Sequence, residues 1–264
     1  PLSLRLTMAW GIPEQLGFTP KLTLRYNDGY VVVGVDGELQ KISSDGLLIG
    51  KPTRPFPTPI RDAVIIDDML IATWLDQELL LARMAALDLR NDFMDGVNRG
   101  ELRVRRTIDK SIHPVGTEWS HVLDAEPISL QANNSSFTFI LWRKGVYNLG
   151  VNSVENWRSP EPTWTKLAKI PRAMDVVATT CNDDTMEIWS KGGGMIQYDV
   201  KTGKIIDQRV LPIDGYLDRV YKTGEHHLIL YNNSHVALYE DGEIMLNAKL
   251  SGPVSYAEWN EIEQ

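Results

Sequence analysis

The sequence predicts an all-β protein built from repeated units of short strands. Runs rich in Val, Ile, Leu and aromatic residues alternate with turn residues along most of the 264-residue chain. The Asp36-Gly37 pair, between the apolar runs 30–35 and 39–42, is typical of a tight β-hairpin turn. Most apolar runs are continuous rather than alternating, as expected for strands that neighbouring sheets cover on both faces.

Hairpin turns recur along the chain, with steps of 40, 68, 48 and 40 residues from one to the next. A repeat near 40 residues made of strands is the period of a β-propeller blade. We therefore expect a β-propeller of four-stranded blades that forms a single domain over residues 1–264. We expect six blades, within a range of five to seven. The turns are Asp36-Gly37, Asp76-Gln77, Lys144-Gly145, Lys191-Gly192-Gly193 and Asn232-Asn233.

The order of strands within a unit is clearest near the end of the chain, where the runs 227–231, 236–239 and 243–246 follow one another. In period and strand order, residues 21–252 resemble the WD-repeat and quinoprotein-like β-propellers. The segment 198–204 is similar to the "aspartate then Thr-Gly" end of a quinoprotein repeat, while no unit carries the Gly-His and Trp-Asp pairs of a WD repeat. The resemblance implies blades made of an inner strand, a hairpin and an outer strand.

One step departs from the period, because 68 residues exceed a 40-residue blade by about 28. We expect an insertion near residues 91–117, in which the turn-rich segment 90–100 precedes an added strand at 102–106. A degenerate extra blade is the competing interpretation. The terminal segments 3–10 and 254–259 are expected to complete one shared blade, so that N- and C-terminal strands close the ring.

Aromatic residues end four of the strands that precede a turn. Large aromatic side chains fill the wedge between stacked sheets, so we expect all four to pack between blades. They are Trp74, Trp142, Trp189 and Tyr231.

Charge and composition restrict the partners. The 35 acidic and 27 basic residues give a net charge of −8, so a nucleic-acid partner is not expected and a basic protein partner would suit the chain better. A single cysteine, Cys181, excludes an internal disulfide framework and favours a cytoplasmic location. No apolar run has the roughly 18 residues of a membrane span, since charged residues interrupt the longest one, 69–89.

Motifs of catalysis are missing from the sequence. It has no Gly-x-Ser-x-Gly elbow, no phosphate-binding Gly-Lys-Ser/Thr loop and no dinucleotide glycine fingerprint. His226 and His227 are adjacent, so in a strand they point to opposite faces and are poorly placed to bind one metal ion. Cys181 follows an apolar strand without a basic neighbour, which predicts an inert thiol.

Acidic residues stand at the predicted start of the first strand in several units. In a propeller these strand starts gather around one mouth of the central channel. The carboxylates could hold a divalent cation, the one cofactor that the sequence suggests, or attract a basic peptide. The alternative is that each is solvated or caps the preceding turn. The residues of this acidic ring are Asp62, Glu126, Asp175 and Asp218.

The predicted strand of the insertion is strongly basic. In a strand, Arg103 and Arg105 would share one face, and with Arg106 they could dock an acidic partner or a phosphate group. The alternative is a solvated edge that prevents pairing with another sheet.

Three functions follow from these features. The leading hypothesis is a non-catalytic propeller that serves as a protein-interaction or ligand-binding platform. The second is a propeller hydrolase or lyase in which channel-mouth carboxylates and a divalent cation activate water. The third is a sensor or structural domain of a longer protein, suggested by a start at Pro1 without an initiator Met.

Overall fold

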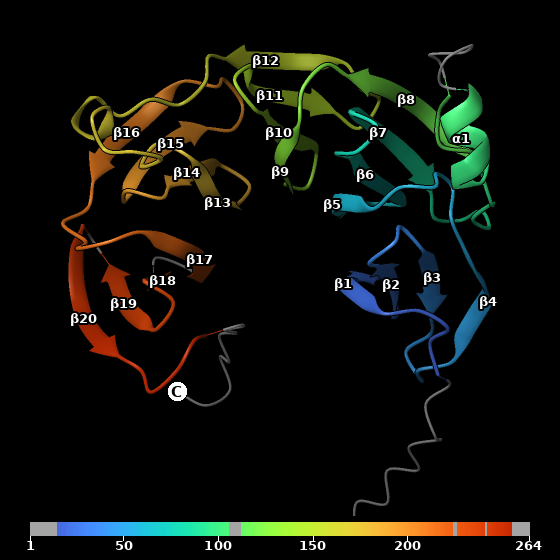
Figure 1. The fold of residues 1–264 in the computed structure, drawn as a ribbon, viewed down its shortest axis with the longest axis horizontal. Coiled ribbons are helices and arrows are strands. Elements are labelled where there is room, and N and C mark those ends of the chain that lie inside the picture. The colour runs from blue at the N-terminus through green and yellow to red at the C-terminus, as the bar shows by residue number, and fades with distance from the viewer. Residues whose placement is uncertain (1–14, 106–111, 224–225, 241, 255–264) are drawn as a thin grey trace, which may run out of the picture. The chain divides into compact units, whose positions relative to one another are not determined.

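The computed structural model describes residues 15–105, 112–223, 226–240 and 242–254, which form five four-stranded sheets (Figure 1). In each sheet the strands lie side by side in chain order. The all-β class and the four-stranded repeat are thus confirmed. The predicted sixth blade and the ring closure fall on the terminal segments 3–10 and 254–259, which lie outside the described residues except for Val254. They stay predictions.

The chain divides into two compact units, residues 1–130 and 131–264, with the boundary inside β9. The first two sheets comprise β1 (Pro20–Tyr26), β2 (Gly29–Gly34), β3 (Leu39–Ile42) and β4 (Leu48–Thr53), then β5 (Ile60–Ile66), β6 (Met69–Asp76), β7 (Leu81–Asp88) and β8 (Thr117–Leu123).

The other three sheets follow in the same order. They comprise β9 (Pro127–Ala132), β10 (Ser136–Leu141), β11 (Gly145–Gly150) and β12 (Glu155–Ser159), then β13 (Val176–Cys181), β14 (Thr185–Ser190), β15 (Gly194–Asp199) and β16 (Ile205–Val210), then β17 (Leu217–Thr223), β18 (His226–Tyr231), β19 (His235–Glu240) and β20 (Glu243–Lys249).

All five predicted turns occupy the same place in their sheets, between the second and third strands of an antiparallel hairpin. Each contains a residue with positive φ, which reverses the chain with the twist that paired strands require. Glycine and asparagine adopt this conformation at little cost. The positive-φ residues in these hairpin connections are Gly37, Leu80, Arg143, Gly145, Gly193, Asn232 and Asn233.

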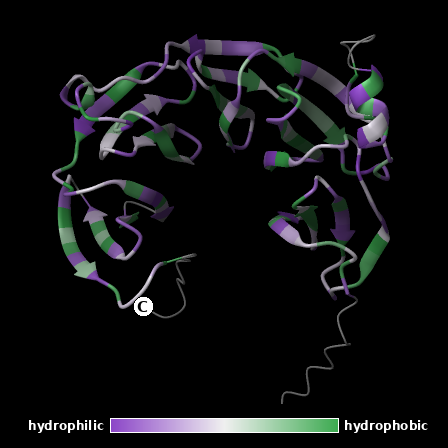
Figure 2. Cartoon of the chain, in the orientation of Figure 1, coloured by the Kyte–Doolittle hydropathy of each residue, from purple (hydrophilic) through white to green (hydrophobic). Residues whose placement is uncertain are grey.

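The second and third strands are the buried centre of each sheet, and the edge strands carry mixed residues. Every residue of β10 is buried, whereas β20 is mostly exposed and combines hydrophilic with hydrophobic side chains (Figure 2). The continuous apolar runs therefore mark central strands covered on both faces, as expected.

Three of the four aromatic residues before the turns are buried, as predicted. Trp74 and Trp189 are 0% exposed and Tyr231 is 4% exposed. The prediction is wrong for Trp142, which is 50% exposed. It lies just past the end of β10, and its ring packs on the Arg143 guanidinium at 4.4 Å instead of on a neighbouring sheet.

In the second sheet, β7 is one continuous strand and its partner β8 follows the insertion. Arg83, a charged residue inside β7, is buried. Its guanidinium donates to the carbonyls of Ile112, 2.9 Å away, and Ala82, 2.8 Å away. The insertion therefore supplies part of what keeps this arginine inside the sheet.

The segment between β7 and β8 forms a helix, α1 (Arg99–Arg105), so the prediction of an added strand at 102–106 is wrong. The Asn98 side chain accepts a hydrogen bond from the Glu101 amide at 2.9 Å and caps the first turn. Leu102 and Ile112 enter the hydrophobic core of the first unit, beside Trp74. Leu102 is the one buried residue of α1, so the helix packs on the core through this side chain.

In the second unit, a buried polar cluster joins the sheet of β13–β16 to the sheet of β17–β20. The Glu187 carboxylate on β14 lies 2.6 Å from His227 Nε2 and accepts a hydrogen bond from the Lys222 ammonium. Thr180 Oγ1 donates to it at 3.0 Å and Trp189 Nε1 at 3.3 Å. We call these five residues the Glu187 cluster.

The Glu187 carboxylate is ionised at neutral pH although its side chain is only 4% exposed. Burial alone would raise its pKa, but hydrogen bonds from His227 and Lys222 and the positive charge of Lys222 lower the pKa to about 2. The carboxylate is thus held between two neighbouring sheets by donors from both, as expected for a buried charge that is stable in place.

Candidate functional site

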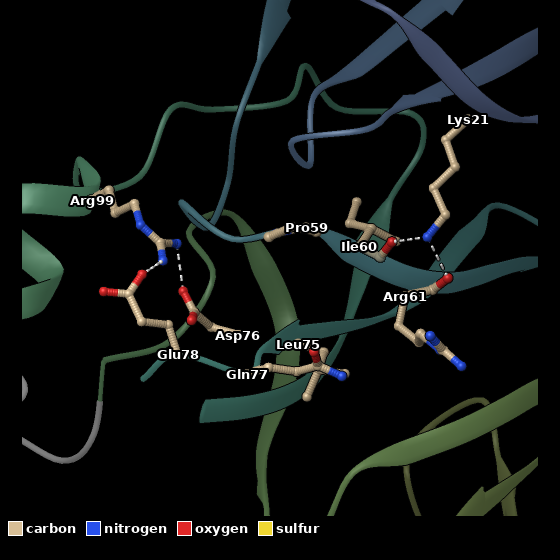
Figure 3. A pocket seen from close by; sticks show the side chains of 9 residues that line it. All are labelled: Lys21, Pro59, Ile60, Arg61, Leu75, Asp76, Gln77, Glu78 and Arg99. Atoms are coloured by element: carbon tan, nitrogen blue, oxygen red, sulfur yellow. Dashed lines mark hydrogen bonds and ion pairs between the residues drawn. The ribbon is translucent and has the colours of Figure 1, made fainter. Parts of the chain in front are cut away.

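A pocket of about 390 Å³ opens in the first unit, where the start of β5 meets β1 and the turn between β6 and β7. Figure 3 shows Lys21 with its two carbonyl acceptors on one side and Arg99 with two carboxylates on the other. The pocket is lined by Lys21, Pro59, Ile60, Arg61, Leu75, Asp76, Gln77, Glu78 and Arg99.

The Lys21 side of the pocket carries two cations. The Lys21 ammonium donates to the carbonyl oxygens of Ile60 at 2.6 Å and Arg61 at 2.8 Å. Burial lowers the pKa of Lys21, the charge of Asp62 opposes this fall, and the charge of Arg61 adds to it. The exposed Arg61 guanidinium makes no hydrogen bond or ion pair with any described residue. Two positive groups therefore stand together without a directly bound carboxylate.

Asp62, one residue of the predicted acidic ring, lies next to this pair. Burial raises the pKa of its carboxyl, and the charges of Arg61 and Lys21 partly oppose the rise. Asp62 is the third residue of β5 and does not line the pocket. Asp62 is therefore a residue of the predicted acidic ring that interacts electrostatically with both cations of the pocket.

On the other side, the charges are neutralised by the insertion helix. Arg99 pairs with Asp76, whose carboxylate is 2% exposed, and with Glu78 at 2.9 Å. Arg103 also pairs with Glu78, at 2.6 Å. The hydrogen bond from Arg99 and the charge of Arg103 lower the pKa of Glu78. Two arginines thus fasten α1 to the turn between β6 and β7.

The structure corrects the predicted basic face. In the helix, Arg103 and Arg105 are two residues apart and point in different directions, so they do not share a face. Arg103 binds Glu78, whereas Arg105 pairs with Glu101 one helical turn away at 3.1 Å. Arg106 lies outside the described residues. Arg103 and Arg105 therefore do not form one strand face, and docking of an acidic partner or a phosphate group by Arg103, Arg105 and Arg106 stays a prediction.

The Arg99→Ala variant should show that the ion pairs of Arg99 stabilise the protein more than an exposed surface ion pair does. We expect Arg99→Ala to reduce the free energy of unfolding by about 1–2 kcal/mol, because the buried Asp76 carboxylate loses its ion-pair partner. Limited proteolysis should then cut the segment 91–105 faster. Arg105→Ala is the control in the same helix and should cost less than about 0.5 kcal/mol, because its pair is exposed. Equal effects in urea unfolding would contradict the role given to Arg99.

The other residues of the acidic ring stand at the starts of first strands, as the sequence indicated, and two have local partners. Asp175 precedes β13 and pairs with Arg172 at 2.9 Å. Asp218, in β17, accepts a hydrogen bond from the Asn233 amide at 2.6 Å. Glu126 directly precedes β9. The contacts of Asp175 and Asp218 are those of residues that stabilise turns, and the acidic ring itself stays a prediction.

In the described part of the chain, no three His, Cys, Asp or Glu side chains come together as a metal site. Burial raises the pKa of the Cys181 thiol to about 11, so it is protonated at neutral pH. His227 faces Glu187, while the next residue along β18, His226, lies 3.3 Å from Glu240. Among the described residues, no helix is long and apolar enough to cross a bilayer.

Sequence reasoning missed Lys21, Arg61 and the Glu187 cluster. Lys21 and Arg61 are 40 residues apart on different sheets, and no local pattern links them. Glu187 did leave a signal, because a carboxylate inside the apolar run 186–189 requires buried partners.

Comparison with solved structures shows the fold. The chain is similar to the β-propeller domain of Cps50 (Swd1) from Myceliophteria thermophila, with 14% identity, 86% of this chain and 67% of that chain covered, and a TM-score of 0.60. It is also similar to BBS1N in complex with ARL6DN, with 11% identity, 89% and 68% covered, and a TM-score of 0.55. No protein-family model and no curated protein sequence matches the chain. The chain therefore has a β-propeller fold.

Proposed function

We propose that this propeller is a non-catalytic protein-interaction platform, and that its Lys21–Arg61 pocket receives an acidic side chain from a partner. The observation that carries the proposal is a pair of neighbouring cations in a pocket, one of which, Arg61, has no partner among the described residues. Lys21 is bound only by neutral carbonyl oxygens. A carboxylate entering the pocket would offset the cost of keeping Lys21 charged while partly buried.

The charge balance of the pocket supports this choice of ligand. Its lining carries three cations, Lys21, Arg61 and Arg99, against the two carboxylates of Asp76 and Glu78. Both carboxylates are already paired with Arg99, on the side away from Lys21 (Figure 3). Asp62 lies beside Lys21 and Arg61 but outside the lining, so its carboxyl offsets part of their positive charge without filling the pocket. The lining itself carries one more positive than negative group, on a chain whose net charge is −8. An acidic group would therefore be drawn to this pocket rather than to the surface in general.

The fold is compatible with such a role. BBS1N, one of the similar structures, is in complex with ARL6DN. A propeller fold does not by itself imply protein binding, so the pocket chemistry is the main support.

The test measures binding of short fluorescent peptides that contain Glu, by anisotropy, to the full chain and its variants. We expect Lys21→Ala/Arg61→Ala to weaken binding about tenfold or more, with affinity falling as salt increases. Lys201→Ala is the matched control, because Lys201 belongs to the other unit and forms an exposed ion pair with Asp184. Replacing Glu by Gln in the peptide should have the same effect as the double variant. Unchanged affinity in the double variant would contradict the proposal.

A further inference from the structure

A second surface lies in the other unit, where two connections between sheets meet. The connection from β12 to β13 contains the short 3-10 helix η1 (Thr165–Leu167), and the connection from β16 to β17 contains Tyr216. The Tyr216 hydroxyl donates to the Pro171 carbonyl at 2.9 Å and ties the two connections together. Lys191 lies between them, because its amide donates to Asp175 and its carbonyl accepts from Leu217.

Three large apolar side chains of these two hydrogen-bonded connections are exposed. Ile170 is 47% exposed, Met174 is 37% exposed and Tyr216 is 42% exposed. Ile170 and Pro171 are adjacent in sequence, and the Tyr216 hydroxyl is bound to Pro171. Clustering of this kind differs from the scattered exposed apolar residues of an ordinary surface.

The same surface has an excess of unpaired positive charge. Lys166, Lys169 and Lys191 form no ion pair with any residue in the part of the chain that the structure describes. Of the nearby acidic groups, Asp175 pairs with Arg172, whereas Asp218 accepts only from a neutral backbone amide and keeps its charge. Asp214 and Asp218 therefore stand against three lysines. We call Lys166, Lys169, Ile170, Met174, Lys191 and Tyr216 the basic-apolar patch.

The backbone beneath the basic-apolar patch is held in place. The Ala173 amide donates to the Ile170 carbonyl at 3.2 Å, and the Gly192 amide donates to the Ala173 carbonyl at 2.8 Å. Ala173 is fully buried beneath the exposed side chains. Arg172 keeps a φ of +58° while its guanidinium binds Asp175. A fixed backbone lowers the entropy lost when a partner binds.

We propose that the basic-apolar patch binds a peptide segment of a protein partner that carries several carboxylates and at least one apolar side chain. The lysines would attract the carboxylates, and the apolar side chain would bury the exposed surface of Ile170, Met174 and Tyr216. This inference does not depend on the Lys21–Arg61 pocket, because it rests on other residues in the other unit.

The experiment measures binding of a short fluorescent peptide that contains Glu and Leu to the full chain. Lys166→Ala/Lys169→Ala and, separately, Met174→Ser should each weaken binding about tenfold. Hydrogen exchange should show protection of the amides of residues 165–175 and 211–217 when the peptide is bound. The matched control is Lys201→Ala/Lys204→Ala, which removes two exposed lysines of the same unit. Circular dichroism checks that each variant is folded.

Several outcomes would overturn the inference. They are absence of binding, loss of affinity in the control double variant to the same extent, and protection that maps to other segments. Binding of vesicles rich in phosphatidylserine, with no binding of the peptide, would assign the patch to an anionic membrane instead. If Lys21→Ala/Arg61→Ala lowers the affinity for the peptide and the patch variants do not, the peptide binds at the Lys21–Arg61 pocket. That result would contradict binding at the basic-apolar patch.

Discussion

Replacement of Glu187 by alanine is expected to lower the free energy of unfolding by about 3–5 kcal/mol. The carboxylate is bound by Lys222 from one sheet and is 2.6 Å from His227, and the Glu187 side chain is only 4% exposed. Without the Glu187 carboxylate, the largely buried Lys222 ammonium group loses its counter-charge. The two sheets also lose the hydrogen bonds that they share through Glu187. Urea unfolding followed by circular dichroism measures the loss.

The matched control for Glu187 is Glu240 in the same unit. Glu240 faces His226 at 3.3 Å, and both side chains are about one third exposed. Glu240→Ala should therefore cost less than about 1 kcal/mol, since exposed pairs contribute little. Similar losses for both variants would show that Glu187 does not act as the ionic link between its two sheets.

Replacement of Trp74 by alanine is expected to cost about 3–5 kcal/mol, because it removes a large aromatic side chain from the core of the first unit. Trp74 is 0% exposed and packs in one cluster with residues of several strands and of the insertion. The surrounding side chains can close only part of the resulting cavity. Thermal and urea unfolding would both report the loss.

Trp142→Ala provides the comparison, since Trp142 also stands where a second strand meets its turn. It is 50% exposed and stacks on Arg143, so its removal should cost less than about 1 kcal/mol. A large loss for Trp142 would mean that it packs against part of the protein outside the described residues. A small loss for Trp74 would contradict its place in the core.

The repeat was predictable from the sequence because it depends on local chemistry. Turn residues such as Gly37 and Asn232 adopt positive φ, and the apolar runs between turns match the buried central strands. The same local rules located the insertion but not its helix, because Arg103, Val104 and Arg105 alternate as they would in a strand. The overlooked signal was Asn98, three residues before Glu101, which is typical of a helix start.

The candidate sites depend on contacts between distant segments, which a repeat period does not encode. Lys21 meets Arg61 only after β1 and β5 come together, and Glu187 meets Lys222 only across two sheets. Arg83 donates to the carbonyl of Ile112, 29 residues away, and nothing near Arg83 in sequence indicates this acceptor. The sequence predicts correctly that Asp62, Glu126, Asp175 and Asp218 lie at or next to the starts of strands. Their convergence on one point stays a prediction, because it depends on how the blades are arranged in space.

Reversal of charge in the pocket tests the central claim most directly. Lys21→Glu/Arg61→Glu should lose the Glu-containing peptide and gain preference for the matched peptide with Lys in place of Glu, measured by anisotropy at low salt. The account predicts that the order of the two affinities inverts. If the variant is folded and still prefers the acidic peptide, the pocket does not receive the acidic group and the proposed binding site is wrong.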